Sequence, residues 1–321
     1  MAAKAWALQQ KPVEEIFFHN DAVSLCLLVN RRSRLMRVID FRAGPSSAKR
    51  LFVQSLAVRE GVERVYTLVE RDEVQTWIKL GFAKEGNIPG FYKRSDAFIL
   101  GTTIRKGAAA STAPEAASPD DVPMQSEIRL TAAEPIHGAT ALSPGHLQME
   151  RTIAAAKREV RDVVEKALPS AKVTLIDEGD ARKAVAHALR QGRAISAFEA
   201  FGRDVERTHF VVHARGGFEL FASTETQACF GNAYLELLTS PKTSAERTGC
   251  FAALRALCEK LTADGIVSCF ALAPSDDVPL AGAFLHNGFR RTGLLSGHLV
   301  VGASRRDAIL WSRKLANPTD E

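Results

Sequence analysis

The sequence predicts an α/β (α+β) protein of two domains, each with a mixed, mostly antiparallel central sheet flanked by helices. Three observations predict this: a length of 321 residues, a central stretch that cannot form a core, and a similar order of strands and helices on either side of it. A chain of this length commonly holds two domains. Apolar residues make up 46% and charged residues 25%, which is typical of globular chains.

Residues 107–146 form the central stretch. Ala, Ser, Pro and Thr dominate it, and aromatic residues are almost lacking. Such a stretch buries too little apolar surface to offset the entropy lost on ordering. We therefore expect a disordered linker, with one short ordered piece at residues 127–130, between a domain at residues 1–106 and a domain at residues 147–321.

The composition argues against a membrane protein and against a metal site. No apolar run reaches the ~18–20 residues that cross a bilayer, and the N-terminus does not read as a signal peptide. The five cysteines are scattered and form no CxxC pair, and no His clusters with them at metal-ligand spacing. Scattered, apolar-flanked cysteines suit a reducing compartment, so we expect a cytoplasmic protein without a metal.

Charge is distributed unevenly along the chain. Residues 1–106 hold 18 Lys and Arg against 11 Asp and Glu, or +7, whereas the remainder holds 24 against 26, or −2. A basic first domain attracts phosphates of a cofactor, nucleic acid or an acidic partner. The basic residues are not interleaved with aromatic residues as in single-strand binders. We therefore do not expect nucleic acid, and a nucleic-acid-associated module is only our third hypothesis.

The first domain reads as three short strands followed by alternating helices and strands. Apolar and β-branched runs predict strands, and apolar residues at helical spacing predict helices. We expect strands at residues 15–19, 23–30, 34–41, 62–69, 86–92 and 96–102, and helices at residues 46–59 and 72–80.

The second domain opens with a long amphipathic helix that Pro169 stops. Thr243 and Glu246 have the spacing of a capping box, which predicts a helix start. We expect helices at residues 147–168, 179–191, 243–263 and 278–287, and strands at residues 173–177, 194–200, 208–214, 217–223, 233–238, 266–271, 297–301 and 307–315.

The later parts of the two domains repeat one another. The first has Arg42-Ala-Gly44, a helix, Gly61, a strand, a helix and Gly81-Phe82; the second has Arg247-Thr-Gly249, a helix, Gly265, a strand, a helix and Gly288-Phe289. Gly44 and Gly81 lie 37 residues apart, and Gly249 and Gly288 lie 39 apart. Matching order, spacing and dipeptides indicate an internal repeat.

This order resembles the acyl-CoA-binding half of the GNAT (GCN5-related N-acetyltransferase) superfamily. Residues 81–97, GFAKEGNIPGFYKRSDA, are similar to the C-terminal end of the β-lysine and related amine N-acetyltransferases. Residues 34–104 resemble the family loosely and residues 170–315 broadly. The resemblance implies two GNAT-like domains, the first lacking the family's N-terminal helices.

In that family a loop of pattern Arg/Gln-x-x-Gly-x-Gly/Ala binds the pyrophosphate of CoA with backbone N–H groups at a helix N-terminus. The resemblance implies acetyl-CoA as co-substrate, held by Phe41, Arg42, Gly44, Ser46, Ser47 and Lys49 in the first domain and by Leu238, Thr239, Arg247, Thr248, Gly249 and Cys250 in the second. Pro45 removes one donor, which hydroxyl and charged side chains partly replace. In the second domain, Glu246 repels a diphosphate unless it turns into the helix cap.

The family tyrosine that protonates the leaving thiolate is replaced by Trp77 in one domain and Phe284 in the other. The resemblance leaves Tyr92 and His286 as general-acid candidates and Glu85 as general-base candidate. Asp96, Glu219, Glu225 and Glu236 are further carboxylates on the expected strands. A base is needed because a protonated amine cannot attack a thioester.

Two functions follow from the resemblance. The first is acetyl transfer from acetyl-CoA to a primary amine, of a small molecule or of a protein lysine, directly in a ternary complex. The alternative is a catalytically degraded GNAT-like pseudo-enzyme that serves as a regulatory or protein-binding scaffold, since a fold does not guarantee a function. The expected partner is an amine substrate or a protein, and the tandem domains are candidates for an internal pseudo-dimer or a homodimer.

Overall fold

The structure is a computed structural model that describes residues 13–20, 23–41, 44, 46–92, 95–104, 143–164, 167–227 and 230–316. The chain divides into two compact units: the described residues of the first lie within Met1–Thr67, Asp72–Lys84 and Leu100–Ala141, and the others belong to the second. The second unit therefore includes residues 85–99, which the sequence analysis placed in the first domain. The predicted linker, apart from its last residues, lies outside the described residues, as does the ordered piece expected at 127–130.

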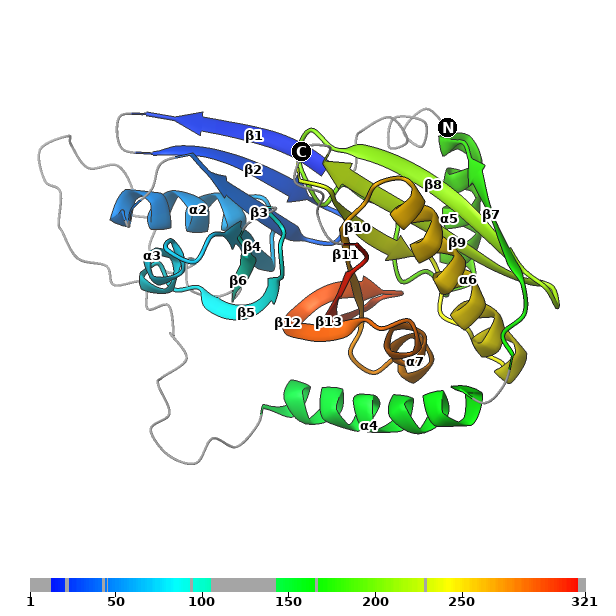
Figure 1. The fold of residues 1–321 in the computed structure, drawn as a ribbon. Coiled ribbons are helices and arrows are strands. Elements are labelled where there is room, and N and C mark those ends of the chain that lie inside the picture. Colours follow the sequence, from blue (N-terminus) through cyan, green and yellow to red (C-terminus); the bar gives the residue numbers. More distant parts are fainter. Residues whose placement is uncertain are drawn as a thin grey trace, which may run out of the picture. The chain divides into compact units, whose positions relative to one another are not determined.

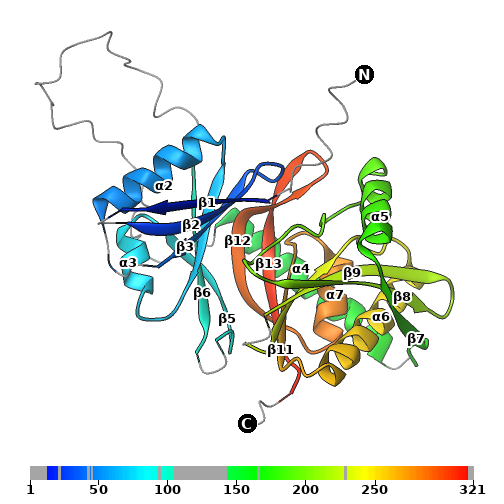
Figure 2. The same cartoon turned by 90° about the horizontal axis from the view of Figure 1, so that it is seen from above.

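The first half of the chain contains six strands and two helices in the described residues (Figures 1 and 2). They are β1 (Val13–His19), β2 (Ser24–Asn30), β3 (Leu35–Asp40), α2 (Ser47–Arg59), β4 (Arg64–Val69), α3 (Val74–Lys79), β5 (Ala83–Ile88) and β6 (Ala97–Thr103). The strands β1, β2 and β3 form an antiparallel meander, and β3 pairs in parallel with β4. Every predicted element of this half is present, with bounds shifted by a few residues.

The second half contains the remaining seven strands and four helices of the described residues. They are α4 (Pro144–Val164), β7 (Ala171–Ile176), α5 (Glu178–Arg190), β8 (Glu206–Ala214), β9 (Phe218–Gln227), β10 (Asn232–Leu237), α6 (Ser244–Ala263), β11 (Ser268–Pro274), α7 (Val278–His286), β12 (Arg290–Val301) and β13 (Ser304–Lys314). Here the strand order is β12-β13-β11-β10-β9-β8-β7. The pair β10/β11 is parallel and its neighbours are antiparallel.

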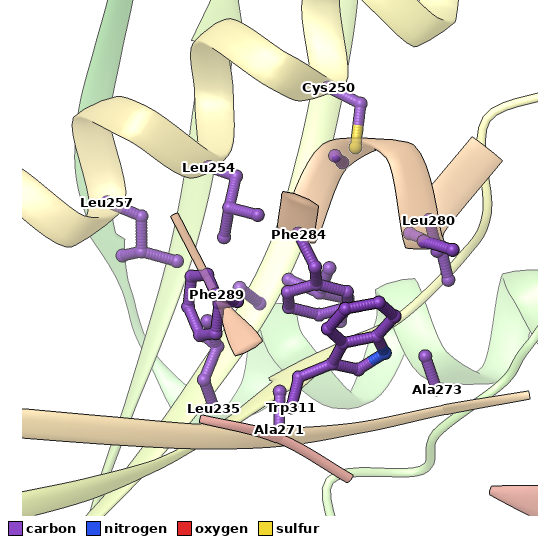
Figure 3. Close-up of a cluster of buried hydrophobic side chains, with 14 of the residues drawn as sticks. Leu235, Cys250, Leu254, Leu257, Ala271, Ala273, Leu280, Phe284, Phe289 and Trp311 are labelled. Carbon is purple, nitrogen blue, oxygen red and sulfur yellow. The ribbon is translucent and has the colours of Figure 1, made fainter. Parts of the chain in front are cut away.

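The core of the second unit lies between this sheet and the helices α4, α6 and α7. Alternate residues of β8, β9, β10 and β11 point into it, as the twofold repeat of a strand requires. Figure 3 shows its centre, where Phe284 of α7 lies against Trp311 of β13 and Cys250 of α6 points toward α7. The ring centroids of Phe284 and Trp311 are 5.4 Å apart, and the two ring planes are stacked at an angle of 17°.

Within the second unit, β5 pairs with β12 through Gly86 and Gly293. Gly86 stands five residues after Gly81, and Gly293 stands five residues after Gly288. The two glycines therefore occupy equivalent positions relative to the two Gly-Phe dipeptides. A Cβ on Gly293 would lie 2.6 Å from the Cα of Gly86. The backbones thus approach too closely for any side chain at either position.

One predicted strand, at residues 194–200, is wrong. Only an isolated bridge between Ala194 and Thr239 forms there. The backbone N–H groups of Phe201 and Gly202, just beyond it, donate to the carboxylate of Glu225 instead of to a strand. Phe198 also has a positive φ of 56°, which interrupts an extended chain.

Among the described residues, no helix is long and apolar enough to cross a membrane.

Candidate functional site

In the first unit the parallel ladder between β3 and β4 ends at Val38 and Thr67, and β3 runs on to Asp40. The Thr67 hydroxyl donates to the Val38 carbonyl at 2.9 Å, which closes the last position of the ladder. Ser46 then caps α2, which begins at Ser47. This unit therefore places a helix N-terminus directly after the end of a parallel ladder, where α/β sheets commonly bind ligands.

The turn into α2 places several of the predicted cofactor residues. Phe41 is exposed and its N–H donates to the Ser24 carbonyl at 3.0 Å. Gly44 has a φ of 106°, which favours glycine, whereas Arg42 lies outside the described residues. The side chain of Ser46, the N-cap, accepts a hydrogen bond from the Lys49 N–H, and Ser47 is exposed in the first turn. That turn holds no acidic residue, so the positive end of the helix dipole is uncompensated.

Lys49 was predicted to bind phosphate, but its ammonium group lies inside the protein. Lys49 is 1% exposed; its Nζ donates to Oδ2 of Asp40 and, at 3.0 Å, to the carbonyl of Gly44. A buried ammonium needs such partners, because an unpaired charge in the interior is costly. Lys49 therefore fixes the turn and is not available to a ligand.

A groove lies between α2 and α3 in the first unit. Its empty volume, which includes the open mouth, is about 310 Å³. The residues that line it are Lys49, Arg50, Val53, Gln54, Trp77, Leu80, Phe82, Thr102 and Ile104. Trp77 packs edge-to-face on Phe82, with 4.9 Å between ring centroids. Within the described part of the chain, no carboxylate pairs with Arg50.

The second unit repeats the frame of the first. The ladder between β10 and β11 ends at Leu235 and Ala271, although β10 continues to Leu237 and β11 to Pro274. The Leu238 N–H donates to Phe221 at 2.9 Å, and its carbonyl accepts from Ile195. Leu238 was predicted to contact the cofactor, but its N–H binds β9 and its carbonyl binds Ile195. Thr239, also predicted to contact the cofactor, follows β10 and forms an isolated bridge with Ala194.

The N-terminus of α6 is capped by the protein itself. Thr243 accepts from the Glu246 N–H at 3.2 Å, and Glu246 Oε2 accepts from the Lys242 N–H at 2.7 Å. This is close to a capping box, with the glutamate reaching one residue further back. Glu246 thus turns into the cap, but its carboxylate stays within 3.7 Å of Arg193 and keeps a negative charge at this helix end.

The other predicted cofactor residues of the second unit lie within the first two turns of α6. Arg247 donates to Glu159 of α4 at 2.9 Å, and the Thr248 hydroxyl to the Ser244 carbonyl at 3.3 Å. Gly249 is buried, and a Cβ there would lie 2.7 Å from the Cβ of Phe218. Complete burial raises the pKa of the Cys250 thiol to about 12. These residues build the helix and its packing, and they leave little room for an anion.

Of the three predicted catalytic residues, Glu85 lies on β5, Tyr92 follows β5, and His286 ends α7. Tyr92 packs edge-to-face on Phe91 and Phe230, with centroid distances of 4.9 and 5.4 Å. The Phe91 carbonyl accepts from Asn232 Nδ2 at 2.6 Å, so this stretch is anchored to β10. Glu85 lies on β5, and its backbone carbonyl oxygen would be 2.6 Å from a Cβ placed on Gly293. Both Tyr92 and Glu85 therefore belong to the second unit.

His286 lies at the end of α7, stacked on Phe251 at 4.9 Å. Its Nε2 accepts a hydrogen bond from Nη2 of Arg255 at 3.1 Å. Partial burial, and then the Arg255 charge, lower the pKa of His286, so the ring is neutral near pH 7. Phe284, at the position of the family tyrosine, is buried against Trp311 and Phe289 and carries no hydroxyl.

A further polar cluster, of which sequence analysis identified only the carboxylates, lies on the sheet face opposite α6. Arg207 of β8 bridges Glu225 of β9 and Glu236 of β10. Glu219, by contrast, is exposed and 3.1 Å from His213. Burial raises the pKa of Glu225 against the opposing effect of Arg207. Arg207 was missed because only the strand register brings it to the glutamates; no local motif marks it.

No protein-family model matches the sequence, and no curated protein is similar to it. Solved structures similar to about half of the chain include two N-acetyltransferases. The ribosomal-protein-S18-alanine N-acetyltransferase from Escherichia coli has 18% identity and a TM-score of 0.35, over 47% of this chain and 97% of its own. The spermidine N-acetyltransferase from Vibrio cholerae, in complex with CoA and spermine, has 11% identity and a TM-score of 0.37, over 46% and 97%.

Proposed function

We propose that this chain is an acetyl-CoA-dependent N-acetyltransferase that binds acetyl-CoA in its first unit and transfers the acetyl group directly to a primary amine, of a small molecule or of a protein lysine. The observation that carries the proposal is the groove between α2 and α3. It begins at a helix N-terminus without acidic residues and includes an arginine without a carboxylate partner in the described residues.

The residues of the groove fit the chemistry of an acyl-CoA. The Arg50 guanidinium, which lines the groove, suits phosphate oxygens. Ser47 and Ala48 are exposed residues of the first turn of α2, whose N–H groups we propose as further donors. Val53, Trp77 and Leu80 form the apolar side of this groove and are themselves buried. Lys49 is excluded from this role because Asp40 and Gly44 already bind it.

In the proposed reaction the amine nitrogen forms a bond to the acetyl carbonyl carbon while the carbon–sulfur bond breaks. A base takes the ammonium proton before attack; the CoA thiolate then leaves and takes up the second proton that the nitrogen loses as the amide forms. Trp77 offers no oxygen acid to that thiolate, and Arg207 holds both Glu225 and Glu236. We therefore assign the rate enhancement chiefly to positioning of the two reactants, since a thioester needs little covalent help.

Calorimetric titration of the full chain with acetyl-CoA tests the binding step. Ser47 and Ser244 both occupy the first position of their helices, and Arg50 and Arg247 both stand four residues after the N-cap. We expect one site per chain. The pair Ser47→Glu with Arg50→Ala should weaken binding at least tenfold, about 1.4 kcal/mol.

The matched pair Ser244→Glu with Arg247→Ala is the control and should bind as the wild type does. No binding by the folded wild type, or equal losses in the two double variants, would contradict the proposal. Amines that release free CoA thiol from acetyl-CoA in the presence of the wild type, and less so with the first-unit variant, would support transfer.

The scaffold hypothesis has one specific observation in its favour. In the second unit, the charged side chains that could bind a cofactor or act as a base already pair with each other. Glu159 pairs with Arg247, and Arg207 bridges Glu225 and Glu236. A chain that binds acetyl-CoA without acetylating any amine, in a screen covering polyamines and lysine peptides, would favour a ligand-sensing scaffold over the transferase.

A further inference from the structure

Side chains from three neighbouring strands of the second unit converge on the face opposite α6. Phe210 and Val212 of β8, with Leu220, Ala222, Leu235 and Leu237 of the next two strands, point into the core. Because strand side chains alternate, Arg207, Ser223, Glu225 and Glu236 point the other way. Register places Arg207 opposite Glu225, and Ser223 opposite Glu236.

The Arg207 guanidinium is fully engaged on both of its terminal nitrogens. Nη1 donates to Ser223 Oγ at 2.8 Å and to Glu236 Oε2. Nη2 donates to Glu225 Oε2 and to the Glu199 carbonyl, both at 2.6 Å. Two carboxylates, a hydroxyl and a carbonyl thus surround one planar cation, an arrangement that matches the fork of a guanidinium and not the point charge of an ammonium.

The remaining lone pairs of the carboxylates hold the segment at residues 196–202 over the sheet. Glu225 accepts from the backbone of Phe201, at 2.9 Å, and of Gly202. Glu236 Oε1 accepts from the Ser196 hydroxyl at 2.6 Å. Every carboxylate oxygen of the cluster therefore has a partner, and the same two glutamates bind the cation and the covering segment.

Burial disfavours the ionised form of both glutamates. The side chains of Glu225 and Glu236 are 2% and 9% exposed. Two buried carboxylates on adjacent strands repel each other and lose their hydration, so a neighbouring cation keeps them ionised and a site without one takes up a proton. Without Arg207 the face would hold two carboxyl groups and several hydrogen-bond acceptors around an unfilled position.

We propose that this face of the second unit is a guanidinium-binding site whose ligand is the chain's own Arg207, and that this internal ligand closes the face to an organic cation from solution. The ligand class is an alkylguanidinium. If the excluded cation is the amine acceptor, this inference rests on the proposed function. In that case the acceptor reacts at the first unit, because Arg207 occupies this face of the second. The site itself does not depend on that function.

Chemical rescue tests the proposal on the full chain without any acetyl-CoA. Arg207→Ala should lower the thermal midpoint, and millimolar N-ethylguanidinium should raise it again in a saturable way. N-ethylurea, which has the same shape without the charge, should have no such effect. The wild type and the exposed-site control Arg215→Ala should not respond to N-ethylguanidinium, because Arg207 already fills the site.

A second variant covers the case in which Arg207→Ala does not fold. Arg207→Lys keeps a charge but not the fork, so it should fold with a lower midpoint than the wild type. Equal effects of N-ethylguanidinium and N-ethylurea on Arg207→Ala would overturn the proposal. So would an Arg207→Lys variant as stable as the wild type, which would mean that any positive charge suffices.

Discussion

The two units place matching residues around matching helix pairs, and they differ in what fills the space. Four residues after the N-cap each has an arginine, but Arg50 has no carboxylate partner in the described residues, whereas Arg247 binds Glu159. Eight residues after the N-cap, Gln54 lines an open groove, whereas Phe251 is buried against His286. At these two positions the first unit has an arginine and a glutamine that line a groove, and the second has a paired arginine and a buried ring.

The comparison shows that a few side chains, and not the backbone frame, decide whether such a unit has room for a ligand. Both units share the parallel strand pair, the capped helix and the Gly-Phe after the next helix. In the second unit, α4 adds Glu159 and an apolar face to the pair α6/α7. A similar order of elements therefore leaves different side-chain partners at the two helix N-termini.

The matched pair Cys250 and Val53 gives the largest expected difference. Each stands seven residues after its N-cap. With a pKa of about 12, Cys250 is about 10⁻⁴ ionised at pH 8, so alkylation should be roughly a thousand times slower than for an ordinary thiol of pKa ~8.5. Mass spectrometry after iodoacetamide should find Cys250 unlabelled in the native protein and labelled in denaturant. A Val53→Cys thiol, next to the groove, should react faster than Cys250, and equal rates would remove the contrast.

Exchanging Phe251 and Gln54 should have opposite consequences in the two units. Phe251→Gln leaves a cavity and an unpaired amide in the core and should lower the free energy of unfolding by about 3–5 kcal/mol. Gln54→Phe should change it by no more than ~0.5 kcal/mol but weaken acetyl-CoA binding. Denaturant unfolding and calorimetry measure the two effects. A harmless Phe251→Gln would show that the second groove is not filled.

Glycines of the predicted loops have different roles in the two units, and alanine substitution should distinguish them. Gly249→Ala brings a Cβ within 2.7 Å of Phe218 Cβ, and the crowding should cost about 1–3 kcal/mol. Gly44→Ala meets nothing within 4 Å, but its φ of 106° should cost about 1–3 kcal/mol through backbone strain. In a Phe218→Gly background, which removes that Cβ together with the ring, the cost of Gly249→Ala should fall, whereas the cost of Gly44→Ala should stay the same. Relief of both variants, or of neither, would contradict this distinction.

The smallest effect is expected for the ion pair between Glu159 and Arg247. Their side chains are 28% and 38% exposed, so Glu159→Gln should lower the free energy of unfolding by only about 0.2–1 kcal/mol, and less at high salt. Arg50→Gln should change stability still less, since it breaks no ion pair among the described residues. A salt-independent loss above 2 kcal/mol for Glu159→Gln would assign this pair a larger structural role.

Local patterns in the sequence were sufficient to predict most of the elements. The capping spacing at Thr243 located the start of α6, and apolar spacing located α2 and α7 within a residue or two. The strand expected at residues 194–200 is wrong, because its neighbours at 201–202 hydrogen-bond to the side chain of Glu225, 23 to 24 residues away. A local pattern carries no sign of such a distant partner.

The candidate site was less predictable for the same reason. Lys49 looked available to a phosphate, and only the fold shows that Asp40 and the Gly44 carbonyl bind it inside the protein. Arg207 went unnoticed because its partners lie on two other strands. The groove itself depends on the pairing of α2 with α3, which spacing alone does not reveal.

Hydrogen exchange of the full chain, with and without saturating acetyl-CoA, tests the central claim most directly, because it locates the ligand in one unit or the other. We expect slower exchange in peptides covering residues 47–54 and 74–82 and no change at residues 244–251 and 278–286. Protection of the second pair of segments, with the first unchanged, would contradict it.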